Sequence, residues 1–171
     1  MNPVVSVVAG GVIVLFGCGA AVLAQPAPPM VEAEPGSQDS NEASKDASKD
    51  ASKQAAVVSM EKWLGMIDEG KYAESWSEAS GLFRDKVTRV QWVQALTSVR
   101  TPLGKLEARK LVSALEQTSV PLPDGKKLEG TFVIAQFDAT FANLQYAIET
   151  VTFEKSPDGA WRASGYYIRP K

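Results

Sequence analysis

The side chains in this sequence that could do chemistry are carboxylates, tyrosines and arginines, because histidine is absent. Histidine is the usual general base near neutral pH and a common zinc ligand, so its absence excludes His-activated nucleophiles and Cys/His metal sites. The one cysteine, Cys18, lies in an apolar N-terminal segment, which leaves the rest of the chain without an internal disulfide. We therefore expect no metal and no cofactor.

Glu149 is the carboxylate most suggestive of a buried site. It alternates with Ala147, Val151 and Phe153 in a strand-like stretch, so it should share their apolar face. Burial tunes the pKa of catalytic carboxylates, but buried carboxylates are more often held in ion pairs. We favour an ion pair and assign no catalytic residue. The arginines considered as partners are Arg84, Arg100 and Arg109.

Four other residues are candidates for a pocket or for solvent contact. Tyr72 could donate a hydrogen bond to a ligand, or it could pack between helices. Trp76 could form the wall of a pocket, although a tryptophan on the inner side of a helix is more often core. Gln136 and Asp138 alternate with apolar residues in one strand, and they are expected on its polar face.

Apolar spacing predicts three helices, and glycines punctuate them. The second of these helices ends before Gly81, and the third opens at Thr88 with Gln91 in the capping-box position. We interpret Asp68 as an exposed residue at the end of the first helix. Arg100 is expected to donate hydrogen bonds to the last carbonyls of the third helix. The predicted helices cover residues 54–69 and 72–80 and a stretch from 88 to about 100.

Four strands follow, rich in Val, Thr, Phe and Tyr. Turn residues at Asn143 and at 157–159 join neighbouring strands closely, which favours an antiparallel meander. The join over 120–130 is harder to interpret. We expect an α+β fold, with three N-terminal helices on one face of a curved four-stranded sheet. The predicted strands are 105–118, 131–142, 144–154 and 160–169.

The N-terminal part is interpreted as targeting and spacer sequence. Residues 1–24 are apolar, and Val22 and Ala24 suit cleavage by signal peptidase, which predicts export to the periplasm or the medium. An uncleaved membrane anchor and a lipoprotein modified at Cys18 are the alternatives. Residues 25–53 hold Ala-Ser-Lys-Asp repeats and are expected to be a disordered linker. The folded domain is assigned to 54–171.

The charge balance of the domain bears on its partners. Residues 54–171 carry fifteen cationic and fourteen anionic side chains, and the signs are interspersed. Nucleic-acid-binding proteins concentrate positive charge on one face, so we expect no nucleic-acid partner. Contact between the domain and a membrane is expected only if the N-terminal segment is retained or lipidated.

Several local motifs resemble a known family of bacterial proteins. They include Ile67-Asp68-Glu69-Gly70-Lys71-Tyr72, Glu74-Ser75-Trp76, Gln91-Trp92, Pro102-Leu103-Gly104 and Asp158-Gly159-Ala160-Trp161-Arg162. With these motifs, residues from about 55 to 170 resemble the domain-of-unknown-function family 4019. That family is similar in plan to the cystatin-like, nuclear transport factor 2-like superfamily, which implies helices packed into a bent sheet. The resemblance implies no activity.

Function is therefore a choice among three classes of protein. The first is a non-catalytic binding or protein-interaction module of the cell envelope, whose partner would be a small ligand or an envelope protein. The second is an enzyme that uses Glu149, and the third is a purely structural tethered domain. The absence of histidine and of a clear acid-base pair favours the first class.

Overall fold

The computed structural model describes residues 7–8, 11–12, 39–121 and 126–171, which form an α+β fold. Two short strands near the N-terminus, β1 (Val7–Val8) and β2 (Gly11–Val12), pair with each other. The helices come before the main sheet in the chain. They are α1 (Asp39–Asp68), α2 (Tyr72–Ser77), α3 (Gly81–Lys86) and α4 (Arg89–Leu103). The strands of the main sheet are β3 (Leu106–Pro121), β4 (Lys127–Phe141), β5 (Leu144–Lys155) and β6 (Trp161–Pro170).

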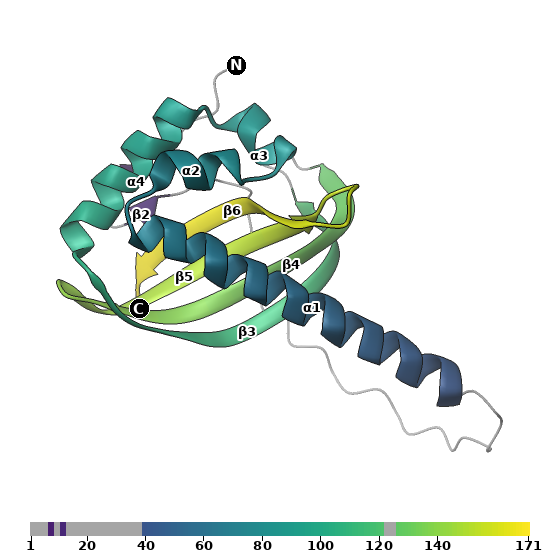
Figure 1. Ribbon diagram of the computed structural model, residues 1–171. Coiled ribbons are helices and arrows are strands. Elements are labelled where there is room, and N and C mark those ends of the chain that lie inside the picture. Colours follow the sequence, from purple (N-terminus) through teal and green to yellow (C-terminus); the bar gives the residue numbers. More distant parts are fainter. Residues whose placement is uncertain (1–6, 9–10, 13–38, 122–125) are drawn as a thin grey trace.

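The main sheet is an antiparallel meander in the order β3-β4-β5-β6, which confirms the predicted strand order. Tight turns at Ala142-Asn143 and at Pro157-Asp158 join the last three strands, as the turn residues predict. Figure 1 shows the helices gathered on one face of a bent sheet. The face covered by the helices is the inner face of the sheet, and the opposite one is its outer face.

The prediction of three helices is wrong, because the region after Gly70 forms two short helices before α4. The hydroxyl of Ser80 accepts a hydrogen bond from the Phe83 amide, so Ser80 caps a new helix that begins at Gly81. The sequence pattern predicts only that the preceding helix ends before Gly81. The capping box between Thr88 and Gln91 is confirmed at the start of α4.

Helix α1 begins at Asp39, well before the predicted start at residue 54. Residues 39–53, assigned to the disordered linker, are therefore helical in the structure, and this part of α1 projects beyond the sheet (Figure 1). Alanine and lysine have high helix propensity, and the repeat adds turns to a helix already held by the domain. From residue 48 on, where burial is described, the first buried residue is Ala56, at which the apolar periodicity starts.

Aromatic rings occupy the space between the helices and the inner face. Trp92 is fully buried, and its ring centroid lies 5.9 Å from that of Trp63 and 5.1 Å from that of Phe83. Both indole N–H groups donate to Ser75, Trp63 to its carbonyl at 2.8 Å and Trp92 to its hydroxyl at 3.0 Å. Tyr166 of β6 completes the cluster beside both tryptophans. The interior is therefore a packed aromatic core.

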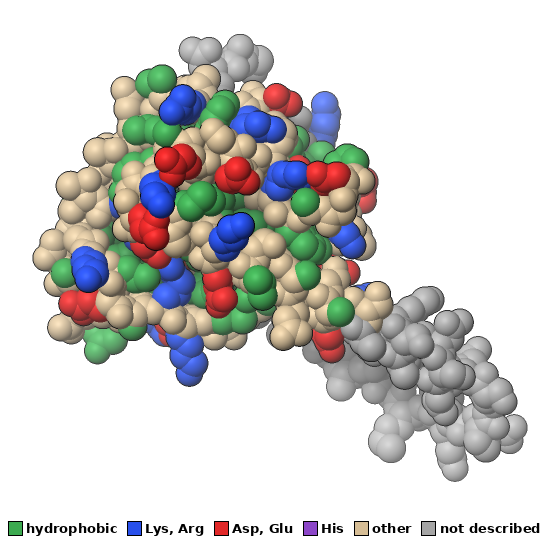
Figure 2. All heavy atoms as spheres, in the orientation of Figure 1, with side chains coloured by type: hydrophobic (Ala, Val, Ile, Leu, Met, Phe, Trp, Pro, Cys, Tyr) green, Lys and Arg blue, Asp and Glu red, His purple; other side chains and the backbone are tan. Residues whose placement is uncertain are grey.

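Most of the predicted targeting segment lies outside the described residues, as does the linker from 25 to 38. Among the helices of the described part, none is long and apolar enough to cross a membrane. Figure 2 shows acidic and basic side chains interspersed over the helical side of the molecule, in keeping with the balanced charge of the domain.

Candidate functional site

Glu149 lies at the centre of a buried network of charged groups. Its side chain is completely buried on the inner face, beside Ala147, Val151 and Phe153, as the alternation predicts. One carboxylate oxygen, Oε1, accepts hydrogen bonds from Arg100 Nη1 at 2.9 Å and from the Tyr166 hydroxyl at 2.6 Å. The other oxygen, Oε2, accepts from Arg109 Nε at 2.6 Å. The predicted pairing of Glu149 with arginine is thus confirmed twice over.

A second carboxylate, Asp68 at the end of α1, closes the network. It pairs with Arg100 and also with Arg109, whose Nη1 lies 2.6 Å from Asp68 Oδ2. The residue as a whole is exposed at the helix end, but only 18% of its side-chain surface is accessible. Two guanidinium groups and two carboxylates therefore balance in charge, and they tie α1, α4, β3 and β5 together.

An alanine and an aromatic ring lie beside the two arginines of the network. Arg109 comes from edge strand β3 and reaches Glu149 on β5 across β4, where the residue opposite it is Ala139. A methyl group at that position leaves room for the arginine side chain. The Arg100 guanidinium lies 4.5 Å from the centroid of the Phe141 ring, an additional cation-π contact.

The network shifts the pKa of both arginines and of Tyr166. Burial opposes the charge on Arg100, yet contacts with Tyr166, Glu149 and Asp68 outweigh it and raise the pKa of this guanidinium. Burial also opposes the charge on Arg109, and Asp68 and Glu149 raise its pKa above the ordinary value. Burial, reinforced by the charge of Glu149, raises the pKa of Tyr166 well above its ordinary value near 10. Both arginines are charged and the phenol is neutral at physiological pH.

Three interpretations made from the sequence change here. Arg84 is exposed on α3 and takes no part in the network. Arg100 pairs with carboxylates rather than with the carbonyls at the end of α4. Asp68 is an ion-pair partner of buried groups rather than a solvated helix end. Each error has the same origin, because these pairs join residues 32 to 49 positions apart in the chain.

The arrangement is suited to holding elements together rather than to proton transfer. A general base needs a lone pair directed at a substrate, and a pKa near the working pH. Both oxygens of Glu149 already accept charge-assisted hydrogen bonds, and its side chain has no contact with solvent. We find no base available at this position.

The remaining candidates lie apart from one another. Tyr72 is half-buried and packs against the core, and burial raises its pKa above the ordinary value. The Trp76 indole N–H donates to the Val87 carbonyl at 2.7 Å, which confirms the core interpretation. Gln136 is exposed on the outer face of β4, so the sheet separates it from the network, although the next residue, Phe137, pairs with Glu149.

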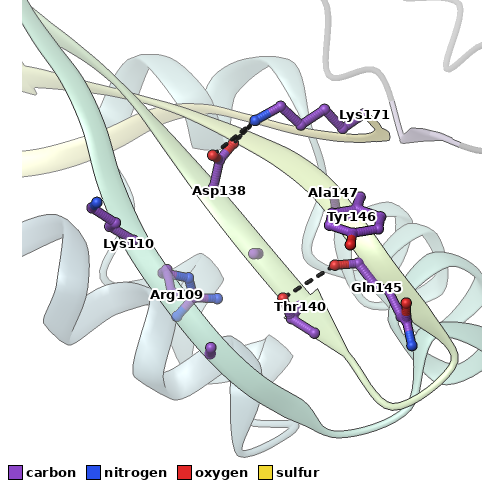
Figure 3. Close-up of a pocket in the computed structure, with 10 residues that line it drawn as sticks. Arg109, Lys110, Asp138, Thr140, Gln145, Tyr146, Ala147 and Lys171 are labelled. Atoms are coloured by element: carbon purple, nitrogen blue, oxygen red, sulfur yellow. Dashed lines mark hydrogen bonds and ion pairs between the residues drawn. The ribbon is translucent and has the colours of Figure 1, made fainter.

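A hollow of about 290 Å³ lies on the outer face, where β3, β4 and β5 run side by side. In Figure 3, Lys110 of β3 stands on one side and Tyr146 of β5 on the other, with Asp138 of β4 between them. The ammonium group of Lys171 reaches Asp138 at 2.9 and 3.1 Å, so the C-terminal residue borders the hollow. Among the residues whose exposure the structure describes, Tyr146 is the most exposed large apolar or aromatic one, at 69%.

The register of the sheet arranges the outer face in rows that cross it, and three of these rows follow one another along the strands. The first row contains Lys110, Asp138, Ile148 and Arg169. The second contains Ser113, Gln136, Thr150 and Tyr167, and the third contains Leu115, Ile134, Thr152 and Gly165. Over these three rows, the face changes from charged to polar to apolar along the strands.

Sequence reasoning missed Lys110, Tyr146, Tyr166 and Lys171. Alternation along β5 could have assigned Tyr146 to the face opposite Glu149, but the place of Lys171 beside Asp138 depends on the pairing of β5 with β6. Among the described residues, no group of three or more His, Cys, Asp or Glu side chains could hold a metal ion.

Comparisons with known proteins identify the family of the chain and nothing more specific. No curated protein matches the chain significantly, and no solved structure does so. The model of a family described as a protein of unknown function (DUF4019) matches residues 59–166, from the middle of α1 to β6. Because this match spans more than half of the sequence, the chain belongs to the DUF4019 family.

Proposed function

We propose that this protein is an exported, non-catalytic protein-interaction module of the cell envelope, and that its binding face is the outer face of the sheet. One observation carries the proposal: the inner face is filled by the aromatic core, whereas the outer face presents side chains to solvent. Ile134 and Ile148 are only half-buried there, and Leu115 is 60% exposed. Exposed apolar groups beside polar ones are typical of surfaces that bind proteins.

The competing functions have less support. A small-ligand site inside the sheet would need space that Trp63, Trp92 and Tyr166 occupy. An enzyme that depends on Glu149 would need a carboxylate free to move a proton, and that carboxylate is paired with two guanidinium groups. A purely structural domain gives no reason for the exposed side chains of the outer face.

Two further parts of the proposal rest on sequence. Export rests on the apolar segment 1–24, and the intact mass of the protein from an envelope fraction tests it. We expect a chain that begins at Gln25, whereas a species retaining Met1, or one with a lipid on Cys18, would contradict cleavage at that site. We also propose that the domain is related to the cystatin-like superfamily in fold, and we infer no function from that relation.

Site-specific photo-cross-linking in intact cells tests the binding face. A photoreactive amino acid replaces Gln136 in one variant and Gln94 in a matched control, since both glutamines are exposed and Gln94 lies on α4. We expect discrete adducts of higher mass from position 136 and none from position 94. The absence of adducts at 136, or equal labelling at both positions, would contradict the proposed binding face.

A further inference from the structure

The strongest feature of the outer face that the network does not use is the first of the three rows described above. Lys110 and Arg169 stand at its two ends, and Lys171 lies beside Asp138 near its centre. Asp138 is already paired with Lys171, and its side chain is 43% exposed. In the described part of the chain, no carboxylate lies within ion-pair distance of Lys110 or Arg169. The row therefore has an excess of positive charge.

We propose that this row binds an acidic, extended segment of a partner protein, through carboxylates of that segment paired with Lys110 and Arg169. The inference rests on the proposed function of the outer face and names the chemistry of the partner. The ends of the row are separated by three strand-to-strand steps, or about 14 Å. An extended peptide rises about 3.3 Å per residue, so carboxylates about four residues apart match the two cations.

The residues between the cations suit the middle of such a segment. Ile148 lies in the row itself, and Tyr146, which is 69% exposed, stands beside the hollow. Apolar or β-branched side chains between the two carboxylates would contact these groups. The Tyr146 hydroxyl and the Gln145 amide at the border of the hollow provide hydrogen-bonding groups for the peptide backbone.

Other occupants fit this charge pattern less well. A second copy of the chain, related by a two-fold axis through the row, would bring like charges together. Anionic membranes attract clusters of about four to eight cations, whereas this row has two, and Lys171 beside it is already paired. Nucleic acid would require a broader basic surface than the nearly neutral domain has.

Fluorescence anisotropy of the mature chain with two labelled peptides tests the proposal. One peptide carries glutamates about four residues apart with valine and threonine between them, and the other carries glutamine in place of glutamate. We expect the acidic peptide to bind more tightly, and its affinity to fall as salt rises from about 0.05 to about 0.5 M. Equal binding of the two peptides would overturn the inference.

Three variants locate the binding. Lys110→Gln and Arg169→Gln should each lower the affinity for the acidic peptide by roughly two- to fivefold, as expected for solvent-exposed ion pairs. Their effects on the affinity should multiply. Lys62→Gln removes an exposed lysine from α1 and should change nothing. Equal melting temperatures show that the variants remain folded. Binding that is insensitive to Lys110 and Arg169 would overturn the inference.

The cross-linking experiment separates this inference from the proposed function. If adducts form at position 136 and the acidic peptide does not bind, the proposal of an acidic partner segment is wrong, and the proposal that the outer face binds a protein is retained. If no adducts form, the proposed function itself fails. An adduct with the mass of two copies of the chain would replace the acidic partner with self-association and overturn the inference.

Discussion

Replacing Glu149 with glutamine removes the charge from the centre of the buried network and keeps the shape of the side chain. The amide oxygen of glutamine can still accept from Tyr166 or Arg100, which Glu149 Oε1 does now at 2.6 and 2.9 Å. The amide nitrogen would then face Arg109 Nε, so that two donors oppose each other. Asp68 would be left as the only carboxylate between two guanidinium groups.

The size of the effect follows from burial. Removing one partner of a buried ion pair generally costs about 3–5 kcal/mol, because the other charge is left without compensation. Arg100 is 4% exposed and Arg109 12%, so neither regains full hydration. The retained hydrogen bonds and the remaining charge of Asp68 reduce the loss. We expect the free energy of unfolding to fall by about 2–3 kcal/mol, and Tm to fall by about 8–12 °C.

Thermal and urea denaturation of the mature chain, followed by circular dichroism, measure this change. Asp138→Asn is the matched control, because it removes an exposed carboxylate whose partner Lys171 is 53% exposed, and we expect it to change stability by less than about 1 kcal/mol. Adding Arg109→Gln to Glu149→Gln should destabilise less than the sum of the two single changes. An unchanged or higher Tm for Glu149→Gln would refute the structural role and reopen the enzyme hypothesis.

The remaining predictions concern titration and the boundary of the domain. Burial raises the pKa of Tyr166 above the ordinary value near 10, so the unfolded chain loses the phenol proton first, and the free energy of unfolding should fall as pH rises above about 10. Ultraviolet titration should detect no ionisation of this phenol until the protein unfolds. Tyr166→Phe should lessen the loss of stability at high pH. The Arg162 guanidinium lowers the pKa of Asp158 to about 2, and NMR titration of Arg162→Gln should return it toward 3.8. A chain that begins at Ser52 should melt within a few degrees of the mature protein, because burial starts at Ala56; a large loss of stability would show that the earlier turns of α1 support the domain.

Local patterns in the sequence predict much of the fold. The strands of the main sheet and the turn at Asn143 were predicted within a few residues, because alternation and turn residues act over short distances. The two short helices after Gly70 were misjudged, since Gly81 both follows one helix and begins the next. The early start of α1 was missed because a polar repeat has no apolar face to mark it.

The candidate sites depended on tertiary structure to different degrees. The sequence alone determined that Glu149 faces the core, because strand alternation assigns each residue to a face and a buried carboxylate requires a partner. It could not select Arg100 and Arg109 over Arg84, nor bring in Asp68, because those contacts depend on how α1 and α4 cross the sheet. The first row of the outer face was likewise decided only by strand register, which aligns residues from four different strands that no local pattern connects.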